Sequence, residues 1–94
     1  MTRFMVVRKF DVSEDEMPEV GRRSRKTIEE TYPEIEWEHS HVVVDDQGTV
    51  MTYCVYAAPT EEMVRSHADD LGQHTIEGIH EIAGDVTPAD FPPV

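Results

Sequence analysis

Two histidines placed two residues apart are the residues of this sequence that most directly suggest metal chemistry. His39 and His41 lie in the run Trp-Glu-His-Ser-His-Val-Val, and alternate residues of a β-strand project from one face, about 6–7 Å apart along the backbone. Imidazole suits borderline divalent cations such as nickel, zinc and copper. The spacing predicts a metal site at this pair, although ordinary strand packing or an exposed surface also produces it.

His67 is a second candidate ligand because it falls within a helical pattern. One face of the expected helix carries its less polar residues: Met63, Val64, His67, Ala68 and Leu71. The imidazole of His67 should therefore point toward the sheet. A buried histidine satisfied by a backbone carbonyl is the competing interpretation. Cys54 is a weaker candidate ligand, since its apolar neighbours in Tyr-Cys-Val-Tyr favour a structural role.

The order of the predicted elements indicates an α+β fold. Periodicity predicts strands over residues 4–10, 35–44, 49–58 and 75–83, with a helix after the first strand and another after the third. Asp15 is the expected N-cap of the first helix, with a Ser13–Glu16 capping box as the alternative. Thr60 caps the second. Strand, helix, hairpin, helix, strand is the ferredoxin-like βαββαβ arrangement, with both helices on one face of an antiparallel sheet.

The third predicted strand has apolar residues on both faces. One face carries Val50, Thr52, Cys54, Tyr56 and Ala58, and the other carries Met51, Tyr53, Val55 and Ala57. A sheet with one face in water should instead alternate apolar with polar residues. We therefore expect a homodimer packed through the sheets, with the proline-rich tail as the rival cover for the second face.

Length, charge and cysteine content indicate the number of domains, the unfavourable partners and the cellular location. The 94 residues fit one domain, expected over residues 1–84 and followed by an extended tail over 85–94. A formal net charge of −12 disfavours nucleic acid and anionic membrane as partners. The early apolar stretch is too short for a secretion signal and Cys54 has no second cysteine to pair with, so we expect a cytoplasmic protein.

No motif typical of an enzyme stands out. The sequence contains no glycine-rich phosphate loop, no Cys-x-x-Cys and no His-Glu-x-x-His. The main alternative to metal binding is nevertheless a small enzyme of the dimeric α+β barrel type, a monooxygenase or an isomerase, because this fold hosts many functions. A purely structural or interaction module is the third possibility.

The stretch Cys-Val-Tyr-Ala-Ala-Pro at 54–59, followed by His67-Ala68, resembles a family of small nickel-binding ferredoxin-like proteins. The resemblance extends over residues 4–82 and includes Trp37, Ser40 and the run Ile-His-Glu-Ile at 79–82. The chain departs from the family pattern at Gly72-Gln73-His74, where members usually have Gly-x-Pro.

This resemblance implies a homodimer and a divalent metal, with nickel the leading candidate. Cys54, Tyr56 and His67 match the family motif, and Ser40 lies near it in the sequence. His39, His41, His74 and His80 are candidates by spacing alone. The sequence therefore favours a nickel-binding or nickel-sequestering protein, with His67, His41, His39 and Cys54 as the expected ligands.

Overall fold

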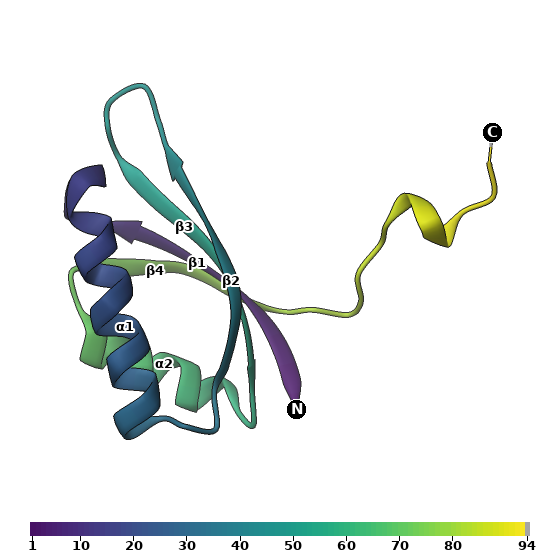
Figure 1. The fold of residues 1–94 in the computed structure, drawn as a ribbon, viewed down its shortest axis with the longest axis horizontal. Coiled ribbons are helices and arrows are strands. Elements are labelled where there is room, and N and C mark those ends of the chain that lie inside the picture. The colour runs from purple at the N-terminus through teal and green to yellow at the C-terminus, as the bar shows by residue number, and fades with distance from the viewer. Residues whose placement is uncertain (94) are drawn as a thin grey trace.

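The computed structural model describes residues 1–93 and contains a four-stranded antiparallel sheet with two helices on one face (Figure 1). The elements are β1 (Thr2–Phe10), α1 (Met17–Thr31), β2 (Glu36–Val44), β3 (Val50–Ala58), α2 (Glu61–Leu71) and β4 (His74–Glu81), with 3₁₀ turns at Glu14–Glu16 and Pro88–Asp90. The strand order is β2-β3-β1-β4. This is the ferredoxin-like order, so the predicted fold is confirmed.

Helix α1 begins differently from the expectation that Asp15 is its N-cap. The alternative pair Ser13 and Glu16 interacts instead, with the Ser13 backbone N–H donating to the Glu16 carboxylate at 3.2 Å. This pair opens a 3₁₀ turn, and α1 proper starts afterwards at Met17. Pro18 thus still lies in the first turn of α1, where its missing N–H leaves no helical hydrogen bond unmade.

The other turns follow the sequence chemistry. The Thr60 side chain caps α2 by accepting a hydrogen bond from the Met63 backbone N–H at 3.2 Å. The β2–β3 hairpin closes with Gly48 at φ +81°, and Asp45 Oδ1 accepts the backbone N–H groups of Gln47 and Thr49. A glycine suits this position because side chains with a Cβ rarely adopt a left-handed conformation.

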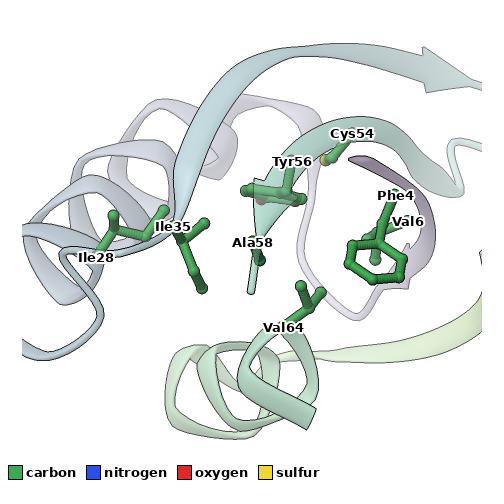
Figure 2. Close-up of a cluster of buried hydrophobic side chains, with 8 residues drawn as sticks. All are labelled: Phe4, Val6, Ile28, Ile35, Cys54, Tyr56, Ala58 and Val64. Carbon is green, nitrogen blue, oxygen red and sulfur yellow. The ribbon is translucent and has the colours of Figure 1, made fainter. Parts of the chain in front are cut away.

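The hydrophobic core lies between the sheet and the two helices (Figure 2). Its main cluster comprises Phe4, Val6, Ile28, Ile35, Cys54, Tyr56, Ala58 and Val64. A second cluster at the other end of the sheet comprises Phe10, Val20, Val50 and Leu71. The side chains that β1 and β3 direct toward the helices are thus buried, in agreement with the alternation of the sequence.

The opposite face of the sheet, here called the outer face, carries no helix (Figure 1). Val43 and Tyr53 lie on it with 46% and 37% of their surface exposed. After β4 the chain makes one ion pair, between Arg3 and Asp85 at 2.7 Å, and then extends away from the sheet (Figure 1). No helix within residues 1–93 is both long and apolar enough to cross a membrane.

Candidate functional site

The two histidines of β2 lie side by side on the outer face. In the β2–β3 register His39 is opposite Val55 and His41 is opposite Tyr53. Their ring centroids are 5.4 Å apart, with the ring planes at 80°. Both side chains are exposed. The structure thus brings this predicted pair together in a position that solvent can reach.

A bulge in β2 places Trp37 on the opposite face of the sheet from His39 and His41. The register shifts between Trp37 and His39, so Trp37 faces inward although plain alternation would place both side chains on one face. The Trp37 ring lies 6.3 Å from that of Tyr56, and its Nε1–H donates to Ser40 Oγ at 2.9 Å. The indole thereby joins the core side, while the histidines stay on the outer face.

His67 points inward, as the helical pattern predicts, and is completely buried. Its Nε2 lies 3.1 Å from Ser24 Oγ on α1, and the rings of Tyr32 and Tyr56 approach its ring edge-on at 6.1 and 5.8 Å. Its Nδ1 has no hydrogen-bond partner within residues 1–93. Burial, together with the positive charge of Arg8, lowers the pKa of His67 to about 4, so the imidazole is neutral near pH 7.

Cys54 lies on the same inner side of the sheet as His67. Its Sγ is 3.4 Å from Thr52 Oγ1 and 3.8 Å from Arg8 Nη1, and the residue is only 3% exposed. The sheet therefore divides the four predicted ligands into two pairs. His39 and His41 project from the outer face, whereas the side chains of Cys54 and His67 lie between the sheet and the helices, so the two pairs do not converge on one ion within a single chain.

No group of three or more histidine, cysteine, aspartate or glutamate side chains is gathered around a common point within residues 1–93. The two remaining histidines, His74 and His80, lie at the two ends of β4. His74 Nδ1 lies 2.7 Å from the Gly72 carbonyl oxygen, and its ring packs on Phe10. His80 is opposite Met5, and its ring covers Gly78 so closely that a Cβ there would lie 2.6 Å from His80 Nε2.

Arg8 is a notable inner-face residue that the sequence reasoning missed. Its side chain is only 2% exposed, and its Nη1 donates to the Tyr56 hydroxyl at 2.8 Å. Its Nε and Nη2 have no partner within residues 1–93. Burial is the main reason that the pKa of Tyr56 rises to about 12, so this phenol is uncharged and does not neutralise Arg8. The signal available in the sequence was an arginine at the inward-facing position between Val6 and Phe10.

A cavity of about 470 Å³ lies between α1 and the sheet and reaches Arg8. Its polar lining residues are Arg8, Glu14, Ser24, Ser40, Cys54 and Tyr56. The remaining lining side chains are mainly apolar and come from both helices, β1 and β2, among them Phe10, Met17, Val20, Trp37, Val42 and Leu71. The inner side of the sheet therefore combines an apolar hollow with one buried cation.

Comparison with known proteins gives one family. The sequence model of the family described as nickel responsive protein SCO4226-like matches residues 4–82. No curated protein and no solved structure matches the chain. The matched range covers all four strands and both helices, apart from the first two residues of β1. The predicted family is thereby confirmed: the chain belongs to the SCO4226-like nickel responsive proteins.

Proposed function

We propose that this protein binds nickel and that His39 and His41 supply the first two ligands. The observation that carries the proposal is the pairing of these two exposed rings, 5.4 Å apart, in a chain of a nickel-responsive family. Metal–imidazole bonds are about 2.0–2.1 Å long, as seen for zinc. Small rotations about the side-chain bonds would therefore let both rings reach one ion. The net charge of −12 also raises the local concentration of cations.

The surroundings of His67 make it a poorer first ligand than the outer pair. A divalent cation at His67 would have to lose its water in a fully buried position close to the charge of Arg8. Removing an ion from water without an opposite charge nearby is costly. Cys54 Sγ lies 3.8 Å from Nη1 of the same guanidinium. We therefore assign the ion to the outer face and keep the inner pair, Cys54 and His67, as the competing location.

Two imidazoles leave most of a nickel coordination shell open. Water or a carboxylate could fill it, but the partly apolar outer face favours a second copy of the chain as the neighbour. Met5, Val7 and Met51 lie on this face without a helix over them, next to the more exposed Val43 and Tyr53. We propose a homodimer packed through these faces, in which the partner contributes ligands or confines the ion.

Calorimetric titration of tag-free protein with nickel chloride tests the ligand assignment. His39→Ala and His41→Ala should each weaken binding by at least about tenfold, since even the loss of an outer-shell partner of a ligand costs roughly 10–100-fold. His80→Ala is the matched control because His80 is exposed on the same face at the opposite edge strand. That control should bind nickel as the unmodified protein does.

The competing location is tested by His67→Gln and Cys54→Ser. The assignment to the outer face fails if these two changes weaken nickel binding while His39→Ala and His41→Ala leave it unchanged. If the unmodified protein takes up no nickel at all, nickel binding itself is wrong, and the response of the family to nickel must have another origin in this chain.

A further inference from the structure

We propose that the cavity between α1 and the sheet binds a small organic acid, whose carboxylate is held by the free edge of the Arg8 guanidinium. Both nitrogens are buried, so the guanidinium would turn toward the hollow for the carboxylate to accept hydrogen bonds from Nε and Nη2, while an apolar body fills the hollow. This site lies on the inner side of the sheet and is independent of the nickel proposed for the outer face.

Arg8 carries a buried positive charge that no carboxylate within residues 1–93 pairs with. The ion pairs within residues 1–93 involve Arg3, Arg22, Arg25 and Arg65 but not Arg8. A buried guanidinium that lacks an anionic partner is costly to maintain, and buried charges in folded proteins are normally paired. Tyr56 satisfies only one nitrogen and remains neutral. An anion from outside the chain would supply the missing charge.

The two nitrogens of Arg8 without a partner within residues 1–93 are Nε and Nη2. Nε and Nη2 are the pair whose N–H bonds run parallel along one edge of a guanidinium, and this edge matches the two oxygens of a carboxylate. Arg3 uses the same edge in this structure, since its Nε and Nη2 donate to the two carboxylate oxygens of Glu38 at 2.8 and 3.1 Å. The unused edge of Arg8 is therefore suited to a carboxylate.

The cavity that Arg8 lines has the size and polarity of a small-molecule site. A hollow of about 470 Å³ is in the usual range for small-molecule sites, which are mostly apolar with a few polar groups. Val20, Leu71 and the Trp37 ring line it, and Ser24 and Ser40 add hydroxyl groups. The lining holds one buried cation, Arg8, and one carboxylate, that of the exposed Glu14. A mainly apolar hollow with this lining suits a monoanion with a hydrocarbon or aromatic body better than a strongly hydrated, multiply charged ion such as phosphate.

Benzoate is a suitable probe, and the change in Trp37 fluorescence on binding is the readout, because Trp37 is the sole tryptophan and lines the cavity. Benzoate should bind saturably. Benzamide, its neutral counterpart of the same shape, should bind about tenfold more weakly or worse, since hydrogen bonds between charged groups are stronger than neutral ones. Equal binding of benzoate and benzamide, or no binding of benzoate, overturns the proposal. Tighter binding of inorganic phosphate than of benzoate overturns the choice of an organic acid.

Two substitutions test separately whether benzoate binding depends on the Arg8 guanidinium and on the space in the cavity. Arg8→Lys keeps the charge but removes the two-pronged edge, and should weaken benzoate about tenfold or more. Arg3→Lys is its control, on the outer face, and should leave benzoate binding unchanged. Gly21→Phe leaves Arg8 intact; Gly21 lines the cavity, and a Cβ there would meet nothing within 4 Å, so the ring should occupy the hollow.

Circular dichroism establishes that each variant is folded. Gly21→Phe should abolish benzoate binding without affecting nickel, so it keeps the proposal testable even if Arg8→Lys does not fold. Benzoate binding that survives Gly21→Phe undiminished places the acid outside the cavity and contradicts the proposal.

Discussion

Among single residues, His67 has the clearest energetic consequence for folding. It is buried as a neutral imidazole between two tyrosine rings, and burial lowers its pKa from 6.5 to about 4. Between these two values the unfolded chain binds a proton that the folded chain does not, so the free energy of unfolding must fall as the pH falls. The stabilisation is complete above about pH 6.5 and is lost toward pH 4.

The expected size of this effect is roughly 3 kcal/mol between about pH 7.5 and pH 4. Urea unfolding of the natural chain and of His67→Gln at a series of pH values measures it. The glutamine cannot titrate, so its curve should be flatter than the natural one by that amount. Parallel curves for the two proteins would show that the pKa of His67 is the same in the folded and unfolded chains.

For Arg8, the sequence predicts the direction of the side chain but not the groups that surround it. Its position in a strand that alternates Phe4, Val6, Arg8, Phe10 marks it as inward-facing. The sequence does not reveal whether a carboxylate of another element will meet it. That depends on which side chains α1, β2 and β3 bring alongside, and in the fold they bring the hydroxyl of Tyr56 and the thiol of Cys54.

At the scale of elements, α1 carries a glycine that its helix does not need. Gly21 lies within Met17–Thr31, and a Cβ at this position would meet nothing within 4 Å. Gly21→Ala should therefore stabilise the fold by about 0.5–1 kcal/mol, because alanine restricts the unfolded chain and favours the helix. The midpoint of urea unfolding measures the change.

At Gly48, the same substitution by alanine should destabilise the fold. It closes the β2–β3 hairpin at φ +81°, so Gly48→Ala should lower the free energy of unfolding by about 1–2 kcal/mol. If both alanines stabilise the fold, the restriction of the unfolded chain by alanine outweighs the effect of the positive φ at Gly48.

Some features of the helices and strands could be predicted from the sequence and others could not. The strand and helix order, the Thr60 cap and the buried face of α2 follow from periodicity and capping chemistry. The β2 bulge does not, because it is defined by pairing with β3 and not by the composition of β2. The predicted ligand set combined His67 with His39 and His41 because the sequence alone did not establish on which face of the sheet each would lie.

At the scale of the whole molecule, the outer face of the sheet is a partly apolar surface that no helix covers. Figure 1 shows both helices on the other side and the tail leading away. On the outer face of β3, Val55 and Ala57 are buried by their neighbours within the chain, whereas Tyr53 is 37% exposed. The proposed homodimer would bury it. Sedimentation at micromolar concentration should give a dimer, and the change Tyr53→Glu should give a monomer, because it would bury a charge at the interface.

Val86→Glu is the matched control for Tyr53→Glu, since Val86 is 74% exposed and lies in the tail. This protein should remain dimeric. A monomer for the natural chain removes the homodimer, and a dimer that persists in Tyr53→Glu moves the interface to another surface. Either outcome would require that water or the chain's own carboxylates complete the proposed nickel shell.

The most direct test of the nickel assignment is anomalous diffraction at the nickel absorption edge from crystals grown with nickel chloride. We expect an anomalous peak within bonding distance of the His39 and His41 imidazoles on the outer face. A peak beside His67 and Cys54, or none at any histidine, would contradict it.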